Sequence, residues 1–281
     1  MQPPTPAVRG ALVAISDFSS LQQRVISACV LAPIAVAALI YGGWGFILFL
    51  ALAGIAMCYE WCDASLSMRK PFFTAILVIV LLAALVLAGE GEMQEAFYIL
   101  MAGAALFLLL GFFMLPGKDR IWALLGPLVI GVPTLSLVLL RMMPERGFIL
   151  TFGLFLVIWA TDIAAYFSGK GIGGPKIAPS ISPNKTWAGL VGGMIGAMIA
   201  AFLVSRTLSG EPVAAFAALG SGAICAILAQ TGDFAESAWK RKFGIKDASN
   251  LIPGHGGVLD RLDGVFLTAP AFLFFLLYMN G

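Results

Sequence analysis

Long apolar runs constrain the fold of this chain more than any other feature of its sequence. A transmembrane helix needs about 20 residues to cross a hydrocarbon core of roughly 30 Å. Open sheets cannot cross, because their edge N–H and C=O groups would have no partners in lipid. Nine suitable runs occur, at residues 25–41, 44–61, 72–88, 96–115, 121–140, 148–167, 187–204, 213–230 and 265–279. The sequence therefore predicts an all-α, polytopic integral membrane protein with about nine transmembrane helices.

The composition excludes an ordinary soluble protein. Hydrophobic residues make up 60% of the 281 residues and charged residues only 11%, and the mean hydropathy is +0.97. A soluble core does not need this much apolar sequence. No linker splits the chain, so we expect one membrane domain over residues 1–281. It would comprise a lead-in at 1–24, six spans in 25–167, spans seven and eight with two long loops in 168–264, and a last span in 265–281.

Lys and Arg residues are unevenly distributed among the connections between these runs. Cytoplasmic loops of membrane proteins carry an excess of both residues. With a cytoplasmic N-terminus, 14 of the 17 Lys and Arg residues fall on the cytoplasmic side, and only Arg141, Arg146 and Arg206 fall on the other. The bias predicts a C-terminus outside and two long cytoplasmic loops, at 168–186 and 231–264. Long ordered loops in compact proteins are usually functional.

The seventh run carries glycines four residues apart. Gly189 and Gly193, like Gly192 and Gly196, have the GxxxG spacing that permits close helix packing. Contacts between helices of one chain are the simpler interpretation. The interface of a homodimer is the alternative.

Charged residues concentrate near the C-terminus. Ten of the 32 charged residues and the only histidine, His255, lie between Asp233 and Asp263. Within this stretch, Asp260, Arg261 and Asp263 stand directly before the last apolar run. Carboxylates at the mouth of a helical bundle suit a hard cation such as Mg²⁺, which in turn usually brings phosphate oxygens. A solvated loop whose acids are neutralised by Arg261 is the alternative.

A second polar stretch follows the eighth run. In helical geometry Asp233, Glu236, Ser237 and Lys240 share one face, at spacings of three and four. Acids at one end of this face and bases at the other could hold a metal beside a phosphate chain. The basic residues 240–242 could instead be an anchor that attracts anionic lipid headgroups.

A third stretch, residues 176–189, combines X-Pro steps with hydrogen-bonding side chains. Ser182, Asn184 and Lys185 suit an ordered loop that donates to phosphate, although Gly and Pro could also be plain turn residues. Asp162 lies inside the sixth run, where a charge usually faces a polar cavity or a partner helix. Nucleophilic triads have little support with a single His, and no basic face interleaved with aromatic residues indicates nucleic-acid binding.

Several of these residues form a recognisable pattern. The segments Ser-Ala-Trp-Lys-Arg (237–241), Lys-Asp (246–247), Pro-Gly-His-Gly-Gly (253–257) and Asp-Arg-Leu-Asp (260–263) resemble the signature of phosphatidate cytidylyltransferases, also called CDP-diacylglycerol synthases. Residues 182–193 resemble the SPxKTxEGxxGG element of that family, with Ala188 where an acid is common. The matching motifs cover residues 162–264, and the first five runs match only in hydropathy.

The resemblance implies the reaction CTP + phosphatidate → CDP-diacylglycerol + pyrophosphate, with Mg²⁺ required and a second cation as an option. CTP, phosphatidate and membrane lipids would be the partners, in a bacterial inner membrane. Asp233, Asp260 and Asp263 are then expected metal ligands. The bases expected to bind the triphosphate and pyrophosphate are Lys240, Arg241, Lys246 and Arg261. The residues expected to bind substrate are Ser182, Asn184, Lys185, Ser237, His255 and Asp162.

Two other functions remain open from the sequence. An ion-coupled transporter would also use an intramembrane acid and Gly-rich loops, although the charges here cluster on one side of the membrane. A cytidylyltransferase acting on another lipid phosphate would share most of the same residues.

Overall fold

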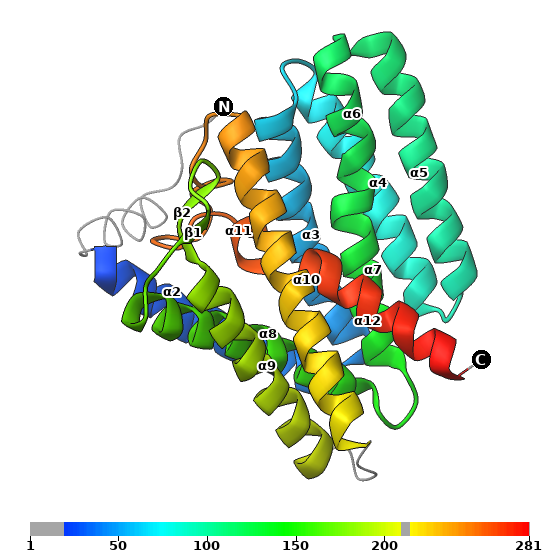
Figure 1. Ribbon diagram of the computed structural model, residues 1–281. Coiled ribbons are helices and arrows are strands. Elements are labelled where there is room, and N and C mark those ends of the chain that lie inside the picture. The colour runs from blue at the N-terminus through cyan, green and yellow to red at the C-terminus, as the bar shows by residue number, and fades with distance from the viewer. Residues whose placement is uncertain (1–19, 209–213, 281) are drawn as a thin grey trace.

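The computed structural model describes residues 20–208 and 214–280, and these residues form a bundle of long helices with one small hairpin (Figure 1). The first 19 residues of the expected lead-in and the start of the eighth expected span, Val213, lie outside the described residues. The helices are α2 (Ser20–Tyr41), α3 (Gly43–Ser65), α4 (Lys70–Gly89), α5 (Met93–Met114), α6 (Gly117–Gly126), the π-helix η1 (Pro127–Gly131), α7 (Val132–Met142), α8 (Gly147–Gly171), α9 (Trp187–Thr207), α10 (Ala215–Lys242), α11 (Leu259–Leu262) and α12 (Val265–Asn280).

The predicted all-α, polytopic membrane class is confirmed. Within the described residues, eight helical segments are long and apolar enough to cross a membrane, with α6, η1 and α7 counting as one segment, 117–142. The ninth predicted span forms α12, which has 16 residues and contains Pro270. This helix is shorter than the roughly 20 residues that a full crossing needs. The count of nine spans therefore stays a prediction.

The two predicted cytoplasmic loops are shorter than expected. Helix α10 continues to Lys242 and converts the first twelve residues of the predicted loop 231–264 into helix. Strong helix formers and the ion pair between Glu236 and Lys240, four residues apart, favour this extension. In the other loop, α8 runs on to Gly171, and strands β1 (Lys176–Ala178) and β2 (Ser182–Thr186) form an antiparallel hairpin.

The helices divide into two groups that meet at α10. Figure 1 shows α3, α4, α5 and the α6–η1–α7 segment side by side, with α8 and α9 together on the opposite side and α2 beside α8. The connections 66–69 and 115–116 lie at the same end of the molecule as the C-terminal end of α10. The polar ends of α3, α6 and α10 are therefore gathered at one end of the bundle.

Small residues let α8, α9 and α10 pack closely. A Cβ added at Gly189 or Gly193 would lie 3.1 Å from the carbonyl oxygens of Ala165 and Thr161 on α8. These glycines thus serve contacts within the chain, as the simpler interpretation predicted, and the homodimer stays a prediction. On the other side of α9, a Cβ at Gly222 of α10 would lie 2.6 Å from the carbonyl oxygen of Ala197.

The crossing of α9 and α10 should not tolerate even one added methyl group. We expect Gly222→Ala to destabilise the protein by about 1–3 kcal/mol through overpacking, and to lower the melting temperature in detergent by several degrees. Gly220→Ala on the same helix is the matched control, because a Cβ there meets nothing within 4 Å. Equal melting temperatures for the two variants would contradict this account of the packing.

Candidate active site

Three carboxylates converge where α10 meets the segment before α12. Asp233 and Glu236 lie one turn apart on α10, Asp263 follows α11, and one oxygen from each lies within 4.8 Å of the others. Gly232 makes the approach possible, since a Cβ there would collide with the backbone carbonyl of Asp263. Residues 30 positions apart in the sequence thus form one acidic cluster, which we call the carboxylate cluster.

The Lys240 ammonium joins the carboxylate cluster to Asp260. Its Nζ lies 2.7 Å from Glu236 Oε2 and 2.6 Å from Asp260 Oδ1. All three side chains are at most 12% exposed. Burying two acids without a cation would be strongly unfavourable, so Lys240 neutralises charge at the centre of the site.

The Asp260 carboxylate is fully engaged by the protein itself. Its Oδ2 accepts hydrogen bonds from the backbone N–H groups of Ala248 and Gly257, both at 2.8 Å. Burial by itself raises the pKa of Asp260, but Lys240 and these two N–H groups outweigh it and hold the pKa below its usual range. Asp260 therefore organises the loop around it. Its predicted role as a metal ligand stays a prediction.

Asp263 has the opposite environment. Burial, followed by the neighbouring charge of Asp233, raises its pKa to about 7, against a smaller opposing effect of the Gly264 N–H. Asp162 on α8 adds to the increase. Negative charge is thus in excess around Asp263, and a bound cation would relieve it.

The hairpin brings a second lysine to the cluster. Lys185, in β2, places its Nζ 2.5 Å from Asp233 Oδ2 and 4.0 Å from the centre of the Phe234 ring. The next residue, Thr186, caps α9 by accepting a hydrogen bond from the Gly189 N–H at 3.0 Å. This cap fixes the end of the hairpin, and with it the lysine.

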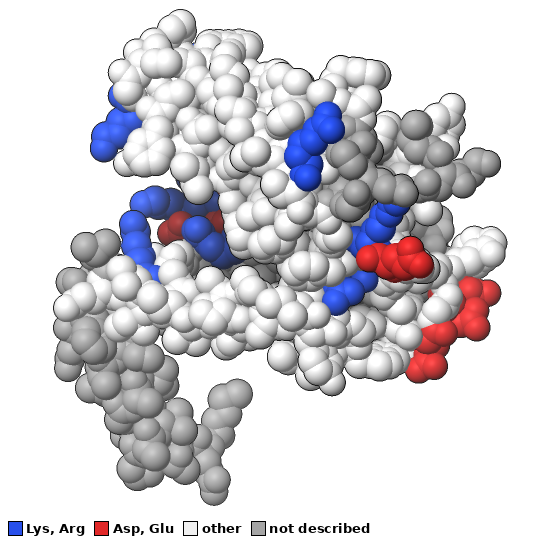
Figure 2. Space-filling view, turned by 90° about the horizontal axis from the view of Figure 1, so that it is seen from below, with Lys and Arg blue, Asp and Glu red and all other residues white. Residues whose placement is uncertain are grey.

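Of the other predicted site residues, some contact the carboxylate cluster and others do not. Ser237 Oγ donates to Asp233 Oδ1 at 3.4 Å, whereas Arg241 donates to the carbonyl of Ile245 at 3.0 Å. Ser182 and Asn184 lie in β2 with Lys185, and Lys246 is exposed in the segment after α10. Figure 2 shows a largely uncharged face on which basic side chains gather around acidic ones in a hollow.

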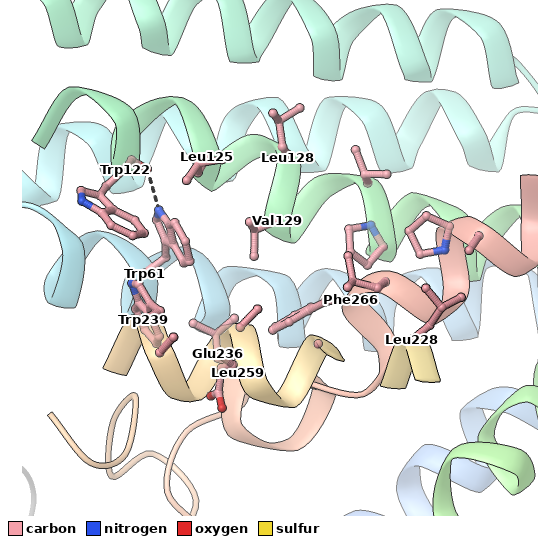
Figure 3. Close-up of a pocket in the computed structure, with 18 of the residues that line it drawn as sticks. Trp61, Trp122, Leu125, Leu128, Val129, Leu228, Glu236, Trp239, Leu259 and Phe266 are labelled. Atoms are coloured by element: carbon pink, nitrogen blue, oxygen red, sulfur yellow. Dashed lines mark hydrogen bonds between the residues drawn. The ribbon is translucent and has the colours of Figure 1, made fainter. Parts of the chain in front are cut away.

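Two cavities flank the carboxylate cluster. The larger, of about 730 Å³, lies between α3, the α6–η1–α7 segment, α10 and α12; Figure 3 shows Trp61, Trp122, Trp239 and Glu236 in its wall. The other, of about 640 Å³, lies between α2, α3, α8 and residues 252–265. It combines long apolar walls with the polar side chains of Asp162, His255, Arg261 and Asp263. We call the second one the lipid cavity.

The carboxylate cluster suits a hard divalent cation. Its donors are all carboxylate oxygens, the ligand type that Mg²⁺ prefers. One of them, Glu236 Oε1, is buried and has no hydrogen-bond partner. An orphaned buried carboxylate oxygen is unfavourable unless a cation completes it. Asp233, Glu236 and Asp263 are therefore the residues that fit a metal.

Reasoning from the sequence missed two residues. Spacing puts Glu236 on the correct helix face, but the expected ligand set contains Asp260 in its place. Glu60 is absent from the expected site, although an acid at the end of an apolar run is a signal by itself. Its carboxylate is completely buried in α3 and accepts hydrogen bonds from Val258 and Leu259 at the start of α11.

Comparisons with known proteins identify the family of the chain. A family model described as "Cytidylyltransferase family" matches residues 22–279. The chain is 41% identical to a phosphatidate cytidylyltransferase of Brucella suis, over 94% of each chain. It is 36% identical to the one from Pseudomonas aeruginosa, over 90% of this chain and 95% of the relative. It is 32% identical to the one from Haemophilus influenzae, over 92% and 99%.

Lys240 should be essential to the folded site. Lys240→Met leaves Glu236 and Asp260 buried without their cation, and we expect a loss of about 3–5 kcal/mol in the free energy of unfolding. Lys70→Met is the matched control, because the pair between Lys70 and Asp63 is half-exposed and such pairs contribute about 0–1 kcal/mol. Thermal unfolding in detergent measures both. Similar melting temperatures for the two variants would show that the Lys240 network is not a structural requirement.

Proposed function

Because the chain belongs to the cytidylyltransferase family, we propose that it transfers a cytidylyl group from CTP to phosphatidate, giving CDP-diacylglycerol and pyrophosphate. It is a nucleotidyltransferase of phospholipid synthesis. The observation that carries this proposal is the carboxylate cluster with two lysines beside a largely apolar cavity that Asp263 also lines. Such a site can hold a phosphate and a lipid at the same time.

Phosphatidate would bind in the lipid cavity. Its apolar walls, from α2, α3 and α8, suit acyl chains, while His255 and Arg261, which also line it, offer hydrogen-bond donors. Burial and the charge of Arg261 lower the pKa of His255, so its imidazole is neutral near pH 7 and can donate one hydrogen bond. The larger cavity has mostly apolar walls, with Glu236 and Lys242 among its lining residues, and suits a phosphate headgroup less well.

Asp233, Glu236 and Asp263 would hold Mg²⁺. When bound, Mg²⁺ supplies positive charge that orients phosphate oxygens and stabilises negative charge in the transition state. A second cation would have to use the same excess of negative charge, to which Asp162 contributes.

The chain's own residues would position two phosphates in line. An oxygen of the phosphatidate phosphate attacks the α-phosphorus of CTP, the new P–O bond forms, and the bond to the β-phosphate breaks with release of pyrophosphate. The nucleophile is a phosphate monoester whose second pKa is near 6, so no activated side chain is needed. Positioning and charge neutralisation then supply most of the catalysis.

The basic residues have three roles in this scheme. Lys185 would exchange its carboxylate partner Asp233 for a phosphate, with Ser182 and Asn184 beside it on β2. Arg241, Lys246 and Arg261 are all exposed, and would hold the triphosphate and the departing pyrophosphate. Lys240 would stay with its two acids and offset part of their negative charge.

The helices and the substrates together indicate the membrane in which the protein lies and the side on which its site opens. The chain is compatible with membrane insertion, and its relatives are bacterial. We place it in the inner membrane, with the N-terminus and the site in the cytoplasm, where CTP is available. The bias of Lys and Arg toward one set of connections supports this orientation.

The comparisons also bear on the two alternatives from the sequence. The relatives' names favour phosphatidate over other lipid phosphates, and nothing in those names points to transport. Mg²⁺, the individual residue roles and the choice of cavity are parts of the proposal that experiments can separate.

The reaction can be tested by omitting each component. Detergent-purified protein should release pyrophosphate only when CTP, phosphatidate and Mg²⁺ are all present. Asp263→Asn should raise the Mg²⁺ concentration for half-maximal release at least tenfold, since it removes one charged ligand from the cluster, whereas Asp63→Asn at the exposed pair should not. Release that is independent of Mg²⁺, or an unchanged Mg²⁺ requirement in Asp263→Asn, would refute the metal assignment.

The choice of cavity can be tested by filling each one. Ala53→Phe narrows the lipid cavity, and we expect it to raise KM for phosphatidate several-fold while KM for CTP stays within about twofold. Ala271→Phe narrows the larger cavity and should leave both constants nearly unchanged. The reverse result would assign phosphatidate to the larger cavity.

A further inference from the structure

A buried acid outside the carboxylate cluster holds the segment that carries Asp260 and Asp263. Glu60 lies near the C-terminal end of α3, and its side chain is 0% exposed. An ionised carboxylate in such a place is strongly unfavourable unless hydrogen bonds satisfy it. The partners of Glu60 therefore indicate why the position has an acid.

Glu60 accepts three hydrogen bonds, two from the polar segment between α10 and α11 and one from Leu259, the first residue of α11. Ser249 Oγ donates to Oε1 at 2.6 Å. The backbone N–H of Val258 donates to Oε1 and that of Leu259 to Oε2, both at 2.8 Å. The contact joins parts of the chain separated by 189 to 199 positions. It ties the segment directly to a transmembrane helix.

Asp260 also accepts a hydrogen bond from the same turn. Its Oδ2 accepts from the N–H of Gly257 at 2.8 Å, so two carboxylates hold the successive N–H groups of residues 257, 258 and 259. The fit is close, because a Cβ at Gly257 would lie 2.6 Å from Glu60 Oε1. Asp263 stands at the end of α11, one helical turn after Leu259, so its position depends on these hydrogen bonds.

The same end of α3 also contacts α10, the helix that carries the other two acids of the carboxylate cluster, Asp233 and Glu236. The Trp61 and Trp239 rings stack with centroids 5.1 Å apart, and Trp239 Nε1 donates to Ser65 Oγ at 2.8 Å. Trp239 lies one turn after Glu236 on α10. Helix α3 thus contacts both the helix that carries Asp233 and Glu236 and the segment that carries Asp263.

We propose that Glu60 is a positioning residue for cytidylyl transfer, which sets the distance between Asp263 and the two acids of α10. The inference rests on the proposed function of the carboxylate cluster. Glu60 acts through the turn 257–259 and contacts neither CTP nor phosphatidate.

The decisive variant is Glu60→Gln, which keeps the size of the side chain but turns one acceptor oxygen into an NH₂ donor that faces N–H and O–H donors. We expect kcat for pyrophosphate release to fall about 10–100-fold, as for other residues that orient metal ligands, with KM for CTP within about twofold. Deuterium uptake by peptides covering 249–262 should rise. Glu60→Asp should show a smaller fall in kcat and a smaller rise in deuterium uptake than Glu60→Gln.

Asp119→Asn is the matched control. Asp119, in α6, is also a buried carboxylate. It accepts hydrogen bonds from the N–H of Ser67 at 2.7 Å and from Ser67 Oγ at 2.5 Å, and Ser67 lies in the connection between α3 and α4. We expect it to lower the melting temperature about as much as Glu60→Gln does, with little change in kcat. A kcat for Glu60→Gln equal to that of Asp119→Asn, or unchanged exchange in 249–262, would overturn the proposal.

A milder variant covers the case in which Glu60→Gln does not fold. Ser249→Ala removes one of the three hydrogen bonds and should produce a smaller loss of kcat together with faster exchange of the Val258 and Leu259 amides; no change in either would overturn the proposal. Hydrogen exchange does not require turnover. A failure of the positioning role is therefore distinguishable from a failure of the proposed reaction, which would appear as no pyrophosphate release by the unmodified protein.

Discussion

The rest of the site depends on one buried cation, the ammonium of Lys240. It lies between Glu236 and Asp260, so it neutralises acids from two separate parts of the chain. Without it, repulsion between the carboxylates would oppose the contact of α10 with the segment before α12. The lysine thus makes a dense acidic cluster compatible with a largely apolar protein, and leaves Asp233 and Asp263 with an excess of negative charge.

In the proposed reaction, the position of this network lets one site serve a lipid and a nucleotide. The carboxylate cluster lies beside a cavity that has long apolar walls and that Asp162, His255, Arg261 and Asp263 also line. A phosphate monoester attached to acyl chains could therefore reach the charged centre while its chains stay among apolar side chains. The nucleotide would use the basic residues around the same centre, so the two substrates would not compete for one pocket.

Helix α3 provides the rigid support for this arrangement. Glu60 binds the N–H groups of Val258 and Leu259 at the start of α11. Trp61 and Ser65 both contact Trp239, through its ring and its indole N–H respectively. Because these contacts are buried and close-packed, small shifts of α3 would be transmitted to the carboxylate cluster. A helix outside the sequence signature therefore holds signature residues in place.

The sequence by itself determined the class of fold and the family, because apolar runs of about 20 residues allow few alternatives in a membrane and the signature residues stand in one stretch rich in charge. It could not determine which acids converge. Spacing placed Glu236 on the correct face of α10, but only the tertiary structure shows Glu236 beside Asp263, with both oxygens of Asp260 engaged by Lys240 and backbone N–H groups. Glu60 shows the same limit, since its partners lie about 190 positions away and no local pattern encodes such a contact. Hydrogen bonds between distant segments depend on how the helices pack, and packing is decided by the whole chain at once.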